Sequence, residues 1–310
     1  MANVRFRKTN ADDYDEVIAV REHLYDGLDY IKDMYHHFLK TETGFAGYIN
    51  NIMVSFVFAA AIDDNARVSV RAARVRKGYE GQGIYKKMRQ YCMMNLPTKA
   101  NTMLLTVSPK ISEKLLKGPA KLILKRNVLE YTTTKTSLKP LLVSKQNSTL
   151  PMHVDKSYFH DVILSQNSKR HFFPENKIVV FSVPYELMSA NVERIFSQTD
   201  ILASCSDAKQ WEFDNGIYPK MISACTSHQC EFGTMIYIDL FGFIGDEKMT
   251  SDHIHAHLLR CVDGSKENIA LYLTYQLIED NETLQRILSK LRGKKTCEQV
   301  FHCIETSVLQ

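Results

Sequence analysis

Three glycines stand close together between a strand-like run and a helix-like run. Gly78, Gly81 and Gly83 follow "VSVRAARVRK" and precede "IYKKMRQYCMMN". Glycine permits tight turns and lets a ligand approach the main chain closely. The first amides of a helix have no internal partner and lie at the positive end of the helix dipole. This order of elements indicates a cradle for a phosphate group.

Two familiar glycine motifs do not match this stretch. A P-loop ends in Lys-Ser/Thr, and the dinucleotide fingerprint reads Gly-x-Gly-x-x-Gly, whereas the order here is Gly78-x-x-Gly81-x-Gly83. An ordinary loop is therefore the alternative to the cradle. Lys77, Lys86 and Lys87 lie close enough in sequence to supply positive charge.

The elements that position this loop follow from hydrophobic periodicity and turn residues. The first half predicts the order β, α, α, β, β, β, α, β, α, β. It contains a strand at 4–9, a helix at 83–95, a strand at 101–109 and a helical segment at 111–127 with a break at Gly118-Pro119. The second half predicts strands at 177–183, 233–243 and 269–277, and a helix capped by Asp280. A chain of 310 residues favours two α+β domains, which we place at 1–140 and 156–310 with a linker at 141–155.

Composition narrows the class of protein. Apolar residues make up 45% of the chain, charged residues 24%, and the net charge is only +4. We therefore expect no nucleic-acid partner and no membrane span. Seven cysteines without framework spacing predict reduced thiols and a cytosolic protein. His253, His255 and His257 have no recognised further ligand beside them, so we predict no metal site.

The glycine stretch and the strand order together resemble the GNAT acetyltransferases. Their pyrophosphate loop reads Gln/Arg-x-x-Gly-x-Gly/Ala after the fourth strand, and Gly81, Gly83 and Ile84 fit it, while Glu80 and Tyr85 depart from it. The resemblance implies a mixed, mostly antiparallel sheet flanked by helices, with acetyl-CoA as co-substrate. The C-terminal half is expected to be α+β and possibly of the same fold. The residues implied to hold acetyl-CoA are Arg74, Val75 and Arg76 with their backbone groups, and Gly81, Gln82, Gly83, Ile84, Tyr85 and Lys86 with their amides.

A narrower resemblance rests on "YDGLDYIKDMYHHFLK", which looks like the substrate loop of the histidine N-acetyltransferase-like family of animals. It implies acetyl transfer to the α-amine of a small free amino acid such as histidine, by direct attack on the thioester. Asp29, Tyr30 and Arg71 are the implied substrate-binding residues. A polyamine, an arylalkylamine, a protein N-terminus, or a catalytically idle CoA-binding module stays open as an alternative, as does the oligomeric state.

The catalytic groups are less well defined by the resemblance. Asp29 and Glu80 are the candidate bases, and the alternative for each is a solvated loop acid. Many GNAT enzymes carry a Tyr acid four residues before a Gly-Phe pair, on the helix after the fifth strand. We expect Ile123 at that position and Asn127-Val128 at the pair, so the usual acid is absent and positioning would carry catalysis.

Overall fold

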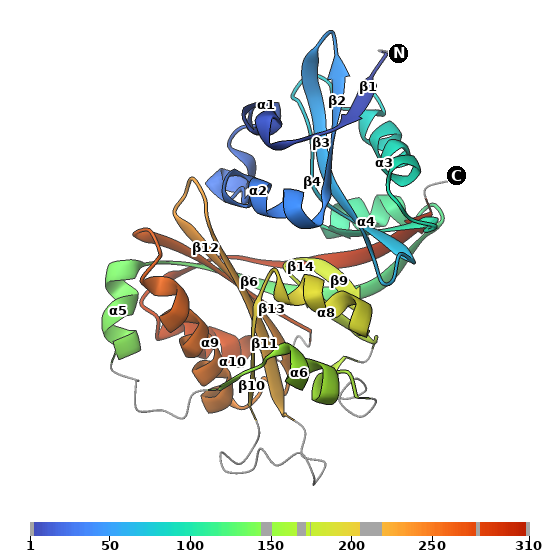
Figure 1. Ribbon diagram of the computed structural model, residues 1–310. Coiled ribbons are helices and arrows are strands. Elements are labelled where there is room, and N and C mark those ends of the chain that lie inside the picture. Colours follow the sequence, from blue (N-terminus) through green and yellow to red (C-terminus); the bar gives the residue numbers. More distant parts are fainter. Residues whose placement is uncertain are drawn as a thin grey trace. The chain divides into compact units, whose positions relative to one another are not determined.

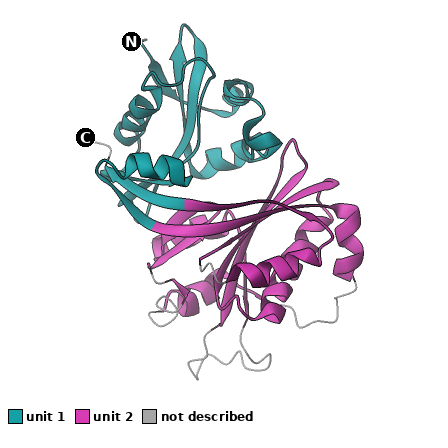
Figure 2. Ribbon diagram, turned by 180° about the vertical axis from the view of Figure 1, so that it is seen from behind, with its two compact units in different colours: residues 1–123, 302–310 teal, residues 124–301 magenta. Residues whose placement is uncertain are grey.

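The computed structural model describes residues 3–143, 151–165, 172–173, 175–204, 219–276 and 280–307. The chain forms two compact units, which Figure 2 shows in two colours. Unit 1 contains residues 1–123 and 302–310, and unit 2 contains residues 124–301. Both limits fall inside long strands, so they differ from the predicted domains of 1–140 and 156–310, which remain a prediction. Helix α5 (Lys135–Val143) occupies the start of the predicted linker, and residues 144–150 of that linker lie outside the described part.

Unit 1 is a sheet with helices on both faces (Figure 1). Its strands are β1 (Arg5–Lys8), β2 (Thr43–Ile49), β3 (Ile52–Ile62), β4 (Arg67–Val75) and β5 (Thr102–Val107). Its α-helices are α1 (Tyr14–Val20), α2 (Ile31–Thr41), α3 (Ile84–Asn95) and α4 (Pro109–Leu115), with short 3-10 turns η1 (Ala11–Asp13) and η2 (Leu24–Gly27). The strand order is β1-β2-β3-β4-β5, and the last residues of β14 (Lys294–Ser307) pair with β5. All neighbours are antiparallel except β4 and β5, which are parallel.

Two apolar layers hold unit 1 together. Between α3 and the sheet, the buried side chains include Phe45, Val68, Met88 and Met103. On the α2 face, the rings of Tyr35, Phe38, Phe56 and Phe58 contact one another in edge-to-face or tilted pairs. Full burial of one such side chain is worth about 1.5–3 kcal/mol, so these layers fix α2 and α3 on the sheet that carries the glycine loop.

Unit 2 repeats this layout with other segments. Its long strands are β6 (Ala120–Thr134), β10 (Asp200–Ser204), β11 (Met221–Gln229), β12 (Thr234–Gly242) and β13 (Asn268–Tyr275), with the two-residue β7 (Met152–His153). Its helices are α5, α6 (Lys156–Tyr158), the π-type turn η3 (Phe159–Ile163), α8 (Ser189–Phe196), α9 (Glu247–Val262) and α10 (Asn281–Ser289), and β8 (Lys177–Val180) with β9 (Val183–Glu186) forms a separate hairpin. The order is β14-β6-β13-β12-β11-β10-β7, in which β12 and β13 are parallel.

The predicted order of the first half is confirmed from β1 to β6, and the predicted strands at 233–243 and 269–277 correspond to β12 and β13. One prediction is wrong. Residues 120–127 belong to strand β6, whereas we expected helical structure on both sides of the break at Gly118-Pro119. The helix ends at Leu115 because Gly118-Pro119 cannot continue it, and β13 then supplies a ladder for β6 from Asn127 onward.

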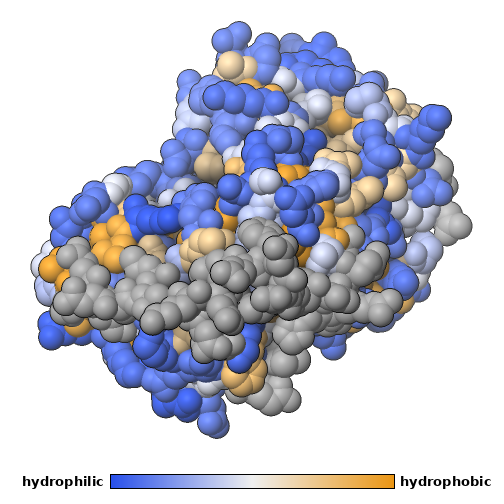
Figure 3. All heavy atoms as spheres, turned by 60° about the horizontal axis from the view of Figure 1, so that its bottom comes forward, coloured by the Kyte–Doolittle hydropathy of each residue, from blue (hydrophilic) through white to orange (hydrophobic). Residues whose placement is uncertain are grey.

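On the face drawn in Figure 3, hydrophilic residues prevail and apolar residues form scattered groups between them. Within the described ranges, no helix combines the length and the apolar character that a membrane crossing requires.

Candidate active site

The glycine loop in unit 1 leads directly into helix α3. Gly78, Gly81 and Gly83 have φ angles of 89°, 76° and 73°, a region that side chains rarely adopt. A Cβ added at any of the three would meet nothing within 4 Å, so the loop faces open space. Gly83 is the N-cap of α3 and no side chain caps that helix end. The first helical hydrogen bond runs from the Lys87 amide to the Gly83 carbonyl at 3.2 Å, so the amides of residues 84–86 precede the hydrogen-bonded part of α3. This is the geometry that a phosphate group requires.

Strands β4 and β5 part beside this loop. Val68 pairs with Met103 and Ser69 with Leu104, and these are the only β4–β5 pairs among the described residues. The strands nevertheless continue to Val75 and to residue 107. We call the unpaired segment, residues 70–75 of β4, the β4–β5 splay. A gap of this kind leaves main-chain donors and acceptors of β4 available to a ligand.

Arg74, Val75 and Arg76, whose backbone groups are implied to hold acetyl-CoA, differ in orientation. The Arg76 amide donates to the Val54 carbonyl at 2.8 Å, so its backbone faces β3. Backbone groups of successive strand residues point to opposite edges. Val75 is therefore the residue whose main-chain groups face the splay, while those of Arg74 face β3 as those of Arg76 do.

A β-bulge in β4 determines which face of the sheet the Arg71 and Arg74 side chains occupy. The register with β3 shifts so that Arg71 pairs with Phe58 and Arg74 with Phe56. Two residues three apart normally lie on opposite faces of a strand, but the extra residue of a bulge returns both to one face. Ala72 has φ 55° at this point, which costs about 1–2 kcal/mol for a residue with a Cβ. No residue type in "VRAARV" marks a bulge, so the sequence did not predict it.

Arg74 forms a buried, bidentate ion pair with Asp29. The two Arg74 Nη atoms donate to the Asp29 carboxylate oxygens at 2.9 and 3.1 Å. Asp29 Oδ1 also accepts from the Ile31 amide at 3.2 Å, at the start of α2. The Arg74 and Asp29 side chains are only 2% and 9% exposed. The predicted base Asp29 is thus engaged by an arginine, and the pair ties the loop before α2 to β4.

Arg71 forms a second buried pair beside the first. Its Nε lies 3.1 Å from Glu42 Oε1, and its guanidinium lies 4.7 Å from the Phe38 ring centre. The Arg71 charge is therefore already compensated by Glu42, a residue that the sequence analysis did not select. A substrate carboxylate at Arg71 would have to share the arginine with Glu42.

Tyr30 contacts both β4 and α2. Its hydroxyl oxygen accepts from the Ala72 amide at 3.1 Å, which satisfies a donor that the bulge turns away from β3. Its ring contacts Phe38 edge-to-face. Burial raises the pKa of Tyr30 well above its ordinary value, so the hydroxyl is protonated at neutral pH. The predicted substrate residues Asp29, Tyr30 and Arg71 are therefore on one face of unit 1.

Glu80 lies away from this group. Its Oε1 accepts from Arg21 Nη1 at 2.6 Å, and both side chains are nearly half exposed. The pair brings a cation from the end of α1 to the loop position where the GNAT motif has Gln or Arg. Tyr85 and Lys86 follow in the first turn of α3. Burial raises the pKa of Tyr85 to about 12, whereas the Lys86 side chain is exposed.

The predicted position of the missing acid is wrong, because Ile123 lies in strand β6 and not on a helix. The helix after β5 is α4, and the glycine that follows it is Gly118. Counting four residues back from Gly118 places Lys114 at the acid position. Lys114 is exposed, so the usual tyrosine is absent there too.

Comparisons with known proteins show which proteins this chain resembles. The family model described as "Histidine N-acetyltransferase, C-terminal" matches residues 146–276. The histidine N-acetyltransferase of Scomber australasicus is 22% identical over 285 residues, covering 84% of this chain and 80% of the relative. That of Xenopus tropicalis is 20% identical, covering 79% and 78%. The human "Probable N-acetyltransferase 16" is 22% identical, covering 80% and 70%.

Solved structures give the fold. A tandem GNAT protein from the clavulanic acid biosynthesis pathway aligns over 99% of both chains, with a TM-score of 0.56 and 9% identity. A putative acetyltransferase from Pyrococcus horikoshii aligns over 98% of this chain and 89% of its own, with a TM-score of 0.52 and 10% identity. The predicted GNAT fold is therefore confirmed. Over most of its length the chain is similar to histidine N-acetyltransferases, at 20–22% identity, which indicates an N-acetyltransferase.

Proposed function

We propose that the protein transfers the acetyl group of acetyl-CoA to the α-amine of a small free amino acid resembling histidine. The observation that carries this proposal is the open glycine loop beside the β4–β5 splay, with two buried arginine–carboxylate pairs on the α2 face of β4. The histidine N-acetyltransferases among the relatives support the choice of amino acid.

The residues of the loop fit the pyrophosphate of acetyl-CoA. The amides of Gly81, Gln82, Gly83, Ile84, Tyr85 and Lys86 are the proposed donors, and the dipole of α3 adds positive potential. The Val75 main chain would pair with the pantetheine arm in the splay. Glu80 forms an ion pair with Arg21, so the negative charge of its carboxylate is compensated.

The acceptor side fits a molecule that carries both an ammonium and a carboxylate. Asp29 and Glu42 can attract the ammonium, and Arg71 and Arg74 can attract the carboxylate. The deprotonated amine attacks the thioester carbonyl of acetyl-CoA, the C–N bond forms as the C–S bond breaks, and CoA leaves as a thiolate that takes up the second proton of the amine. Asp29 is the proposed acceptor of the amine proton in preference to Glu80, because Asp29 lies on the same face as Tyr30 and Arg71. Fixed orientation in such a site can contribute about 7–11 kcal/mol to catalysis.

The test is thiol release by the purified protein from acetyl-CoA with a panel of amino acids. We expect turnover with histidine or a close analogue, and none with N-acetylhistidine, whose α-amine is blocked. Absence of turnover with every amino acid, while acetyl-CoA still binds in calorimetry, would exclude the amino-acid proposal. Spermidine, tryptamine and a peptide with a free N-terminus belong in the same panel, since turnover with one of them would identify the alternative class. Binding without any turnover would instead indicate a catalytically idle CoA-binding module.

A further inference from the structure

Unit 2 contains a second copy of the strand order that holds the proposed acetyl-CoA site in unit 1. The order β7-β10-β11-β12, then α9, then the parallel strand β13, matches β1-β2-β3-β4, then α3, then the parallel strand β5. The end of the β12–β13 pair therefore corresponds to the β4–β5 splay, and the start of α9 corresponds to the start of α3.

The parallel strands of unit 2 do not part. Six consecutive positions pair, from Thr234 with Ile269 to Asp239 with Thr274, whereas only two positions pair between β4 and β5. The Thr274 hydroxyl also donates a hydrogen bond to the Asp239 carboxylate. The backbone groups that a pantetheine arm would need are therefore used by the neighbouring strand.

A buried arginine closes the end of this pair. Arg126 Nη2 donates to the Leu240 carbonyl of β12 and to the Thr274 carbonyl of β13, both at 3.0 Å. Its guanidinium also lies 4.7 Å from the Phe241 ring centre and 4.0 Å from Asp239. The Arg126 side chain is only 4% exposed. It bridges the two strands just beyond their last paired position.

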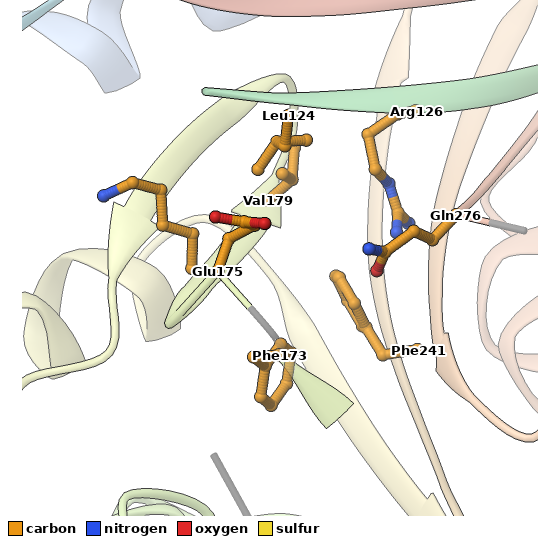
Figure 4. Close-up of a pocket in the computed structure, with 8 residues that line it drawn as sticks. Leu124, Arg126, Phe173, Glu175, Val179, Phe241 and Gln276 are labelled. Atoms are coloured by element: carbon orange, nitrogen blue, oxygen red, sulfur yellow. The ribbon is translucent and has the colours of Figure 1, made fainter. Parts of the chain in front are cut away.

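The cavity beside Arg126 is too small for a cofactor arm. Figure 4 shows Arg126, Phe241 and Gln276 on one side of this cavity, opposite Glu175 and Val179. Its volume is about 10 Å³, which is about the space that one water molecule needs.

The start of α9 also differs from the start of α3. Asp246 is its N-cap and accepts from the Met249 amide at 3.0 Å, and Glu247 follows in the first turn. In unit 1 the corresponding helix end is Gly83 without a side-chain cap, followed by Lys86 and Lys87. The Asp246 carboxylate accepts a hydrogen bond from an amide that a pyrophosphate would otherwise contact. The negative charges of Asp246 and Glu247 would also repel a pyrophosphate.

We propose that unit 2 is a GNAT-like module whose cofactor cleft is closed by Arg126 and Asp246, so that the chain binds one acetyl-CoA, in unit 1. The proposal rests on the proposed function for the identity of the ligand in unit 1. Its structural basis, the closed strand pair and the capped helix, is independent of that identity.

Calorimetry of the full chain with acetyl-CoA tests this directly. We expect one equivalent per chain, and no saturable binding after Gly83→Val, which places a β-branched side chain at a φ of 73°. The matched variant Gly245→Val alters the glycine before α9, where φ is not positive, and should leave stoichiometry and affinity unchanged. Thermal melting of each variant confirms folding.

Two equivalents in the wild-type chain, or one equivalent remaining in folded Gly83→Val protein, would overturn the proposal. The wild-type stoichiometry decides the question even where a variant fails to fold. Binding of no acetyl-CoA at all would refute the proposed function of unit 1 and would agree with a closed unit 2, so the two failures are distinguishable.

Discussion

The Asp29–Arg74 pair gives the sharpest test of the site in unit 1. Replacing Asp29 with Ala removes three hydrogen bonds, two from Arg74 and one from the Ile31 amide. It also leaves a guanidinium that is 2% exposed without its carboxylate. Removal of one partner of a buried pair costs about 3–5 kcal/mol. For a unit of this size, such a loss lowers the melting temperature by about 10 °C or more.

The assay combines thermal melting with thiol release from acetyl-CoA. Asp15→Ala is the matched control, because Asp15 is an exposed acid of α1 and its loss should cost less than about 1 kcal/mol. The double variant Asp29→Leu/Arg74→Met should recover much of the lost stability, since both charges are then gone. It should stay inactive.

Asp29→Asn separates the two roles of this residue. The amide keeps the shape and one acceptor oxygen but cannot accept a proton. A loss of about 100-fold or more in kcat, with substrate KM little changed, would identify Asp29 as the base. A rise in KM with little change in kcat would instead identify a positioning residue. If Asp29→Ala melts with the control and keeps full activity, the reasoning about this pair is refuted.

Three further predictions concern charge. Arg21→Ala should raise the KM for acetyl-CoA several-fold by leaving Glu80 uncompensated, and Glu80→Gln on that background should restore it; an unchanged KM would remove the pair from cofactor binding. Burial lowers the pKa of His253 to about 3, below its unfolded value near 6.5, so only the unfolded chain gains a proton at this residue as the pH falls from 7 to 5. The stability of unit 2 should therefore fall by about 2 kcal/mol over this range. Urea unfolding of His253→Gln should show a smaller dependence on pH. Burial raises the pKa of Asp239 to about 6, so its charged form opposes folding. Its contribution should decrease stability by about 2 kcal/mol as the pH rises from 4 to 6, and Asp239→Asn should abolish that decrease.

Local features of the sequence predicted the order of elements and the glycine loop. The positive φ angles of Gly78, Gly81 and Gly83 follow from residue type, because few other residues adopt them. Periodicity likewise predicted β12 and β13 closely. The segment after Gly118 was misassigned because its strand character depends on its place in the sheet between β13 and β14, both of which come from the far end of the chain.

The partners of the charged residues could not be predicted in the same way. Asp29 and Arg74 are 45 residues apart, and Arg21 and Glu80 are 59 apart. Neither separation follows a helical or strand period, so only the tertiary fold brings these side chains together. Sequence reasoning selected Asp29, Arg71 and Glu80 as single residues and missed that each is engaged by a counter-charge.

The bulge at Ala72 explains why both arginines of β4 serve one site. In a regular strand Arg71 and Arg74 would point to opposite faces, and one of them would enter the layer packed against α3. The extra residue turns both toward α2, where Glu42 and Asp29 compensate them. The same bulge directs the Ala72 amide to Tyr30 instead of β3. One strained residue thus sets the positions of the charged groups on the α2 face, while the other edge of β4 stays open toward the splay.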